Sequence, residues 1–338
     1  MSTLSREVKI AVVIPCFRVR TQLPGVIRKI GPEVLRIYVV DDACPEHSAE
    51  FARDRCNDSR IKIIRHAANR GVGGAVISGY REAIKDGMDI VIKIDGDGQM
   101  DPALIPAFVN PIIKGKADYT KGNRFFSIQN LKKMPRVRIF GNAVLSFLNK
   151  LSSGYWSIFD PTNGYTAINT KVLKILPLEL IDNKYLFETD MLYQLGLIRA
   201  VVVDVPMVAE YGDEISNLRI SKEFSRFLTR HITNSFKRIL YNYYLRDFSI
   251  ASVELAMSFL FIAFGVIFGV FSWAESSAAE TFASSGSVML AAMPIIIGCQ
   301  LLISFLAYDI GVQPKIPVSD LIQIRNPKHF ETGKQEIQ

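Results

Sequence analysis

Two long apolar runs near the C-terminal end constrain the fold of this chain more than any other feature. Residues 255–273 and 287–308 contain no charged side chain, and each is near the roughly 20 residues that a helix needs to cross a bilayer. A pair of buried core helices is the alternative, and the tandem arrangement argues against it. Pro294 and Gly298 interrupt the second run, which neighbouring helices tolerate. The sequence predicts a transmembrane helical hairpin over residues 251–310.

The distribution of basic residues predicts the orientation of this hairpin. Lysine and arginine are absent from Asp247 to Pro314 and flank that stretch on both sides. Because positive charge favours the cytoplasmic side, we expect the linker between the helices outside and both termini in the cytoplasm. The N-terminal segment MSTLSREVKI has no apolar signal core, so residues 1–218 are expected to form a cytosolic domain and 311–338 a cytosolic tail.

Residues 219–250 join these two parts and have an amphipathic pattern. Apolar residues recur there at three- and four-residue steps, with lysine and arginine largely between them. This pattern predicts a basic helix that lies in an anionic lipid interface, and packing on the soluble domain is the alternative. The net charge of +7 is concentrated beside the hairpin, which favours a membrane over nucleic acid. The four cysteines lack metal-ligand spacing and are expected to be free thiols.

Short runs rich in valine and isoleucine alternate with helix-like segments before residue 100. The runs are residues 9–17, 35–43, 60–66 and 89–98, and the helix-like segments lie near 22–30, 46–56 and 72–86. This alternation predicts an α/β domain with a mostly parallel sheet, whose ligands bind beyond the carboxyl ends of the strands. Polar residues follow all of these runs and are expected to meet at one crevice. A dinucleotide fingerprint after the first run and a P-loop motif are both absent, which argues against hydride transfer and ATPase functions.

The segment VIKIDGDGQM, residues 91–100, ends a buried strand with two carboxylates one residue apart. Asp95 and Asp97 face the same way across Gly96, and like charges this close need a positive partner. An ordinary strand-to-turn junction uses the same residue types. Together with Gln99, the two carboxylates offer the hard oxygen ligands that suit Mg²⁺ or Mn²⁺. The pattern leaves open which carboxylate ligates the metal.

Six motifs occur in the order and spacing of family 2 glycosyltransferases. They are VVIPCF, VVDDACPEHS, NRGVGGAVISGY, DGDGQMDP, KGNRF and DPTNGYTAI. Over residues 8–220 the chain resembles the polyprenyl-phosphate glycosyltransferases, the group that includes dolichol-phosphate mannose synthase. The C-terminal hairpin is similar to that of a subgroup of these enzymes.

This resemblance implies a fold and a reaction. The implied fold is GT-A, a Rossmann-like domain with a mostly parallel sheet. The implied donor is a UDP- or GDP-sugar, and the implied cofactor is Mg²⁺ or Mn²⁺. The implied reaction is the inverting transfer of a hexose or N-acetylhexosamine to undecaprenyl or dolichyl phosphate at the cytoplasmic membrane face, which gives a polyprenyl-phosphate sugar donor.

The resemblance also implies roles for individual positions. The residues implied to frame the nucleotide are Pro15, Phe17, Asp41, Asp42 and Asn69. The residues implied to bind metal and diphosphate are Asp95, Asp97 and Gln99, and Arg124 matches a basic residue near phosphate. The segment PCFRVR departs from the family start P-x-Y-N-E, and Val72 replaces a lysine that is frequent in the family. A loosely matched acceptor loop supplies Arg219 and Lys222.

A lipid-phosphate acceptor changes what the protein must provide. Such a phosphate is largely dianionic at neutral pH, so it needs no general base but needs cations that reduce the repulsion between two phosphates. Arg136 and Arg138 are candidates, with solvated surface charge as the alternative. Asp160 precedes a Pro and an Asn-Gly turn and is expected on a loop rim over the sugar. Glu188 and Asp190 begin a helix, where carboxylates either contact the sugar or acceptor or act only as caps.

Other functions and assemblies remain to be distinguished. A processive polysaccharide synthase would carry Gln-x-x-Arg-Trp, and neither Trp156 nor Trp273 follows an arginine. A non-catalytic membrane module that binds sugar nucleotide is an alternative from another class, and a family 2 transferase with a different acceptor is a second. Gly265 and Gly269 form a G-x-x-x-G step that packs helices in membranes, which suggests a homo-oligomer.

Overall fold

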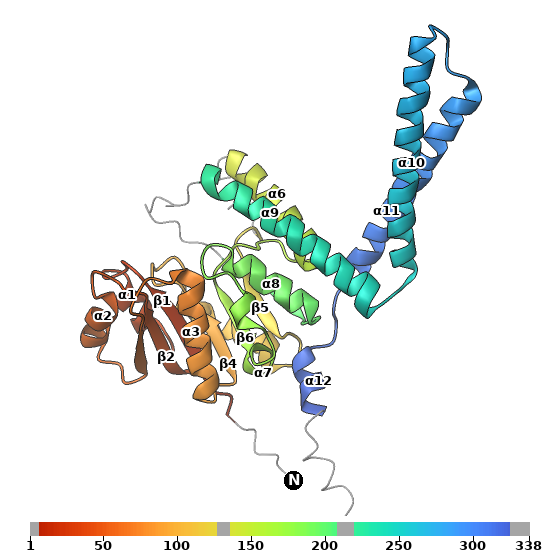
Figure 1. Cartoon of the computed structure of the whole chain (residues 1–338). Helices are drawn as coiled ribbons and strands as arrows, with labels where there is room; N and C mark the ends of the chain where they lie inside the picture. Colours follow the sequence, from red (N-terminus) through yellow and green to blue (C-terminus); the bar gives the residue numbers. More distant parts are fainter. Residues whose placement is uncertain (1–6, 127–135, 208–219, 325–338) are drawn as a thin grey trace, which may run out of the picture. The chain divides into compact units, whose positions relative to one another are not determined.

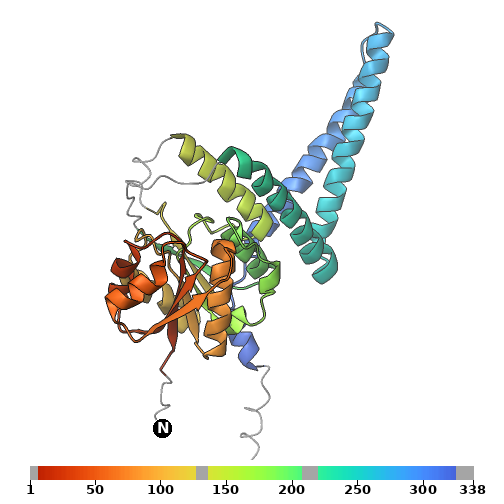
Figure 2. The same ribbon diagram turned by 60° about the vertical axis from the view of Figure 1, so that its left-hand side comes forward.

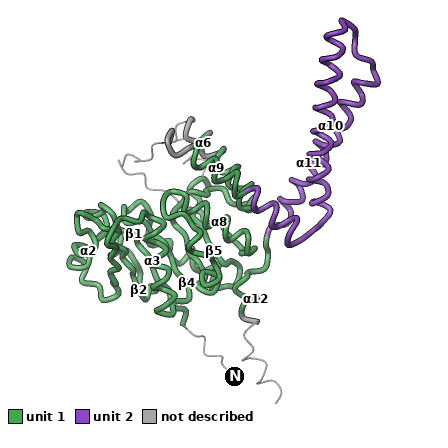
Figure 3. Tube along the Cα trace, in the orientation of Figure 1, with its two compact units in different colours: residues 1–234, 314–338 green, residues 235–313 purple. Residues whose placement is uncertain are grey.

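The computed structural model describes residues 7–126, 136–207 and 220–324. The chain forms two compact units, one of residues 1–234 and 314–338 and the other of residues 235–313 (Figure 3). Both ends of the second unit therefore continue into the first. The division of the chain into four segments, with boundaries after residues 218, 250 and 310, stays a prediction.

The first unit contains a seven-stranded sheet in the order β3-β2-β1-β4-β6-β5-β7. The strands are β1 Ile10–Cys16, β2 Val34–Asp41, β3 Ile61–Arg65, β4 Ile90–Lys93, β5 Tyr119–Asn123, β6 Thr166–Asn169 and β7 Val202–Pro206. β6 pairs antiparallel with β4 and β5, whereas the other neighbours pair parallel. The expected mostly parallel α/β sheet is therefore confirmed.

Helices cover both faces of this sheet, and the side-chain alternation of β1 shows why. The helices of this unit include α1 Leu23–Arg28, α2 Ser48–Cys56, α3 Gly71–Lys85, α4 Ile105–Ile113, α6 Arg136–Ser153, α7 Thr170–Leu173, α8 Phe187–Leu197 and α12 Val318–Ile324 (Figure 1). Val13 belongs to a core that α3 and α8 complete, whereas its neighbours Val12 and Ile14 belong to a second core under α1, α2 and α4. Strands buried on both faces need apolar residues at successive positions, as their sequences have. The first strands and helices coincide with the segments expected from the sequence.

The amphipathic segment forms helix α9, Ile220–Ile239, which lies beside α6 in both views (Figures 1 and 2). Arg230 Nη2 lies 2.6 Å from Oδ2 of Asp190, which is fully buried. Ser152 Oγ lies 2.8 Å from Nδ1 of His231, also buried. Ile232 is 59% exposed on another side of the helix. One face of α9 therefore packs on the first unit, and contact of its exposed face with lipid stays a prediction.

Docking of α9 predicts an acid-sensitive contribution to stability. Burial lowers the pKa of His231 from 6.5 to about 4. Between these values the unfolded chain binds a proton that the folded chain does not, so stability is lost as pH falls from 6.5 to 4, by up to about 3 kcal/mol. Burial also raises the pKa of Asp204 to about 6, which has the opposite effect over much of the same range.

The contribution of His231 must therefore be measured as a difference. We expect the difference in free energy of unfolding between the protein and its His231→Gln variant to shrink from pH 7 to pH 4, in urea titrations of the detergent-solubilised chain. A difference that does not change with pH would contradict the prediction. A Ser146→Ala variant, altered at a residue of α6 whose hydroxyl donates to Phe159, is the control for a pH-independent change.

The second unit is dominated by two helices, α10 Ile250–Ala278 and α11 Ser285–Gly311. Both are long and apolar enough to cross a membrane, with mean hydropathies of 2.3 and 2.2 in their most apolar windows. A Cβ on Gly265 would lie 2.6 Å from the carbonyl oxygen of Ala291, and one on Gly298 would lie 2.9 Å from that of Ser258. The Gly265–Gly269 step therefore packs within the hairpin, so it no longer supports an oligomer, and the oligomeric state stays a prediction.

Candidate active site

A cavity of about 460 Å³ lies beyond the carboxyl ends of β1, β2 and β4. The start of α3 and the loop before α8 complete its wall. The sequence-predicted residues that line it are Pro15, Phe17, Asp42, Asn69, Asp95 and Asp97. Lys184 and Tyr185 also line it and were missed, because a lysine and a tyrosine in a polar loop give no sequence signal. Acidic side chains thus face one lysine across this cavity, within the residues that the structure describes.

The DGDG turn after β4 brings the two expected carboxylates to the floor of the cavity. Gly98 has φ of +83°, a conformation that glycine adopts without strain, and it lets the chain reverse after Asp97. Asp97 Oδ1 accepts the backbone N–H of Gln99 at 3.0 Å. Asp95 Oδ1 lies 2.9 Å from Lys93 Nζ. Lys93 is therefore a positive partner of the kind that two adjacent carboxylates need.

Lys93 is a buried cation that sequence reasoning missed. Its side chain is 1% exposed, and Nζ also lies 3.0 Å from Oε1 of Glu188. Burial alone would lower the pKa of this amine, but the carboxylates of Asp95 and Glu188 raise it above its ordinary value. The available signal was a lysine inside a strand that is otherwise apolar, because a charged residue in such a place needs a buried counter-charge.

The carboxylates after β2 act mainly within the protein. Asp42 is 3% exposed. Its Oδ2 accepts the backbone N–H of Gly71 at the start of α3, and its Oδ1 lies 2.7 Å from His66 Nδ1. Asp41 Oδ1 accepts the backbone N–H of Cys44. Asp41 is not among the residues that line the cavity, so of the two expected nucleotide contacts only Asp42 reaches its wall.

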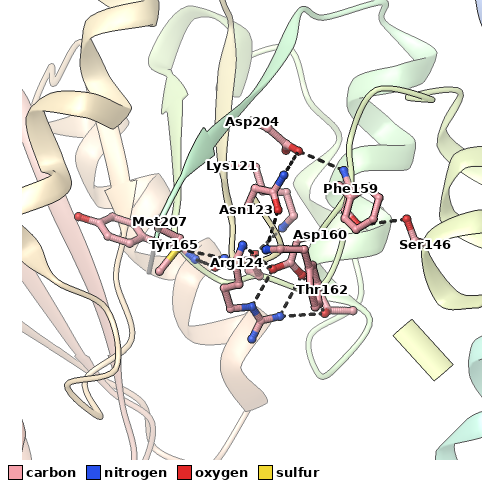
Figure 4. Close-up of polar contacts among 12 residues, drawn as sticks. Lys121, Asn123, Arg124, Ser146, Phe159, Asp160, Thr162, Tyr165, Asp204 and Met207 are labelled. Atoms are coloured by element: carbon pink, nitrogen blue, oxygen red, sulfur yellow. Dashed lines mark hydrogen bonds and ion pairs between the residues drawn. The ribbon is translucent and has the colours of Figure 1, made fainter. Parts of the chain in front are cut away.

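Arg124 and Asp160 form a bidentate ion pair at the end of β5 (Figure 4). Arg124 Nε lies 2.7 Å from Asp160 Oδ2, and Nη2 lies 2.9 Å from Oδ1. Asp160 is 1% exposed, and its expected place on a loop rim over the sugar stays a prediction. The chain turns directly after Asp160, whose carbonyl oxygen accepts the backbone N–H of Asn163, and the Asp160 carboxylate fixes the direction of the guanidinium. Neither side chain is among those that line the cavity beyond β1, β2 and β4.

A second buried lysine, Lys121, and a partly buried carboxylate, Asp204, stand beside this pair in Figure 4. Lys121 Nζ donates to the carbonyl oxygen of Asn163, and burial lowers the pKa of this amine to about 8. Asp204 Oδ2 accepts from Asn123 Nδ2 at 3.0 Å and from the backbone N–H of Phe159 at 3.1 Å. These contacts hold the KGN segment that precedes Arg124. Sequence reasoning missed them, since Asp204 lies about eighty residues further along the chain.

The two carboxylates at the start of α8 point to different partners. Glu188 is directed to Lys93, whereas Asp190 is fully buried. Asp190 is bound by Arg230 and Asn234 of α9, and its expected contact with sugar or acceptor stays a prediction. The helix begins after Leu186, which makes no side-chain cap. Glu188 is therefore linked to Asp95 through Lys93, whereas Asp190 holds α9 against α8.

Four predicted acceptor contacts fall outside what the structure describes. Arg219 lies outside the described residues. Arg136 and Arg138 belong to α6 and Lys222 belongs to α9, and their side chains lie outside the described part.

The donor set suits a hard divalent cation that is completed by a ligand. Within residues 7–126, 136–207 and 220–324, no group of three or more His, Cys, Asp or Glu side chains is arranged to hold a metal. Asp95 and Asp97 line the cavity, and carboxylates in this number suit Mg²⁺ or Mn²⁺, which commonly binds one or two carboxylates together with substrate phosphates. The residues thus fit a metal that is shared with a phosphate ligand.

Comparison with solved structures defines the class of fold. Glucosyl-3-phosphoglycerate synthase of Mycobacterium tuberculosis superposes with a TM-score of 0.50 at 19% sequence identity, over 68% of this chain and 79% of that one. This likeness shows the fold, and the first unit is a GT-A domain.

Comparison with known sequences gives the family. Residues 11–176 match the model of glycosyl transferase family 2. The chain is 28% identical over 190 residues to UDP-N-acetylglucosamine–dolichyl-phosphate N-acetylglucosaminyltransferase of Methanococcus voltae, covering 52% of this chain and 75% of that protein. It is 27% identical over 204 residues to undecaprenyl-phosphate mannosyltransferase of Micrococcus luteus, covering 59% and 82%. The chain belongs to family 2 of the glycosyltransferases, and the resemblance inferred from its motifs is confirmed.

Proposed function

We propose that this glycosyltransferase moves a hexose or N-acetylhexosamine from a nucleotide-diphosphate sugar to a polyprenyl phosphate, with inversion, at the cytoplasmic membrane face. The observation that carries the proposal is the cavity in which Asp95 and Asp97 lie with Lys184. Its relatives are named as transferases to dolichyl and undecaprenyl phosphate. The two apolar helices supply the membrane contact that such an acceptor requires.

The cavity chemistry supports a nucleoside diphosphate as the donor. Phe17 is 41% exposed and offers an aromatic surface to a base. Lys184 adds a positive charge to a cavity whose other charged lining residues are carboxylates, and a diphosphate needs such a charge. Asp97, Asp95 and Gln99 would hold Mg²⁺ or Mn²⁺, and the structural neighbour was solved with Mn²⁺ and UDP. When bound, the cation offsets the charge that develops on the leaving nucleoside diphosphate.

The acceptor chemistry suggests a role for Arg124, which does not line the cavity. A phosphate monoester is already an anionic nucleophile near neutral pH, so no side chain has to remove its proton. Arg124, fixed by Asp160, provides a guanidinium directed by a rigid partner, which suits recognition of a phosphate. The protein then has to hold the acceptor oxygen opposite the leaving group, and a single displacement of this kind inverts the anomeric centre.

The chain connections support a location of both ends of the hairpin on the same side of the membrane. The segment before it is held through Asp190, and α12 after it is held through Asp118, whose carboxylate accepts the backbone N–H groups of Val318 and Ser319. Both contacts lie within the first unit. With lysine and arginine on both flanks, the cytoplasmic side follows from the positive-inside rule.

A donor and acceptor panel tests the proposal. The detergent-solubilised protein is incubated with UDP- and GDP-sugars, MgCl₂ or MnCl₂, and undecaprenyl phosphate, and products are identified by mass spectrometry. We expect one glycosyl-phosphoryl lipid, whose formation stops with EDTA. Tight nucleotide binding without a lipid product from any donor would overturn the lipid acceptor and favour the non-catalytic binding module or a different acceptor.

A further inference from the structure

We infer that Lys93 and Glu188 act as a buried positioning pair that fixes the Asp95 carboxylate at the floor of the donor cavity. The inference rests on the proposed function, because it concerns how that site holds a nucleotide and its cation. It assigns Glu188 to a role behind the cavity wall, where it acts on the ligand only through Lys93 and Asp95.

The three side chains are graded in exposure from the interior to the cavity. Lys93 is 1% exposed, Glu188 13% and Asp95 30%. The Lys93 amine lies 2.9 Å from Asp95 and 3.0 Å from Glu188, so a single buried cation binds both carboxylates. Lys93 ends β4 and is paired in register with Thr166 of β6, which anchors its backbone in the middle of the sheet. The amine therefore has little freedom to follow Asp95 if that side chain moves.

Gly164 closes the other side of this arrangement. A Cβ at this position would lie 2.4 Å from Lys93 Nζ and 2.7 Å from Asp95 Oδ2. The backbone of Gly164 therefore lies directly against both members of the ion pair. Asp95 is held between the lysine amine and this backbone, which limits the orientations of its carboxylate. Any side chain at position 164 would have to displace one of them.

The charges explain why Glu188 is needed as well as Lys93. With Lys93 alone, Asp95 would be neutralised by its partner and would attract a cation or a sugar hydroxyl only weakly. Glu188 compensates the lysine from behind, so the three groups together keep one negative charge, and Asp95 is the most exposed of them. A fixed charge held by buried partners costs no reorganisation when a ligand binds. Asp97 lies in the following turn, where its Oδ1 accepts the backbone N–H of Gln99.

A paired apolar replacement separates positioning from folding. Replacement of a buried ion pair by apolar residues of similar volume is often neutral for stability, whereas removal of one partner is not. We therefore compare wild type with the double variant Lys93→Met/Glu188→Leu. The readouts are the melting temperature and the Kd of UDP and of GDP, each measured with MnCl₂ and with EDTA. We expect the double variant to have a nearly normal melting temperature. We expect its Mn²⁺-dependent gain in nucleotide affinity to be smaller than that of wild type by a factor of about 10 or more.

A glycine variant tests the same idea without removing a charge. Gly164→Ala pushes directly on Lys93 and Asp95, and we expect it to reduce the Mn²⁺-dependent gain in nucleotide affinity as the double variant does. Gly25→Ala is the matched control, because a Cβ there meets no atom within 4 Å. If the double variant does not fold, the Gly164→Ala variant still tests whether Lys93 and Glu188 position Asp95.

Each outcome has a distinct meaning. A full Mn²⁺-dependent gain in a folded double variant, or in Gly164→Ala, would overturn the positioning role and leave Lys93 and Glu188 as structural residues. A wild-type protein that gains no affinity for UDP or GDP from Mn²⁺ would overturn the proposed donor chemistry, and the inference with it. A reduced gain in the variants, beside a normal gain in wild type and Gly25→Ala, supports the inference.

Discussion

Asp97→Ala is expected to abolish transfer of sugar to lipid while the protein stays folded. Asp97 lines the cavity from a turn and is partly exposed, so its removal opens no space in the hydrophobic core. Loss of a group that helps neutralise the leaving diphosphate costs several kcal/mol of transition-state stabilisation, which corresponds to a rate lower by about 1,000-fold or more. The measurement is the initial rate of glycolipid formation at saturating donor, alongside the melting temperature.

Asp101→Asn is the matched control for this experiment. Asp101 is an exposed acid four residues further along the same segment, and its Oδ1 accepts the backbone N–H of Ala103 as a helix cap. Asparagine caps helices about as well as aspartate, so we expect an unchanged rate. An Asp97→Ala variant with nearly normal turnover would remove Asp97 from the reaction and contradict the cation site proposed for this turn.

Asp118→Asn is expected to cause the largest loss of stability among isosteric changes in the catalytic unit. Asp118 is fully buried, and its two oxygens accept the backbone N–H groups of Val201, Val318 and Ser319 at 2.8–2.9 Å. An asparagine would turn an NH₂ group toward at least one of these donors. Because hydrogen bonds to charged groups contribute roughly 1.5–3 kcal/mol each, we expect a loss of about 3 kcal/mol or more.

This loss should release the segment that follows the two apolar helices α10 and α11. Helix α12 is held at its first residues by Asp118, so limited proteolysis should cut near α12 faster in the variant, together with a melting temperature lower by roughly 6–12 °C. Asp320→Asn, at an exposed acid of α12 itself, is the control. Equal melting temperatures and proteolysis rates in Asp118→Asn and wild type would show that α12 is not held by this carboxylate.

Sequence patterns predicted the parts of the fold that local chemistry controls. Apolar runs of two lengths separated the strands from the transmembrane candidates, because a buried strand and a bilayer-crossing helix need different numbers of apolar residues. The polar residues after β1, β2 and β4 came together at one cavity because parallel strands present their carboxyl ends at the same edge. The family resemblance, read from six motifs in order, agrees with the family model over residues 11–176.

The partners of charged residues were not predictable in the same way. Asp42, Asp160 and Asp190 were expected to contact ligand, and the structure binds each to groups of the protein itself. A carboxylate after a strand looks the same in a sequence whether it faces a cavity or a helix terminus. Only the packing of distant segments decides which donors surround it.

The sequence by itself determined that this protein has a mostly parallel α/β domain, two apolar helices and a DGDG turn after a buried strand, because periodicity, run length and turn chemistry are local properties. The tertiary structure alone decided that Lys93 is the counter-charge of Asp95, and that Glu188 joins it from α8. Those residues are up to 95 positions apart, and their pairing depends on strand order and helix packing. Charge in a protein interior is balanced across space, and its pattern along the chain does not reveal the partners.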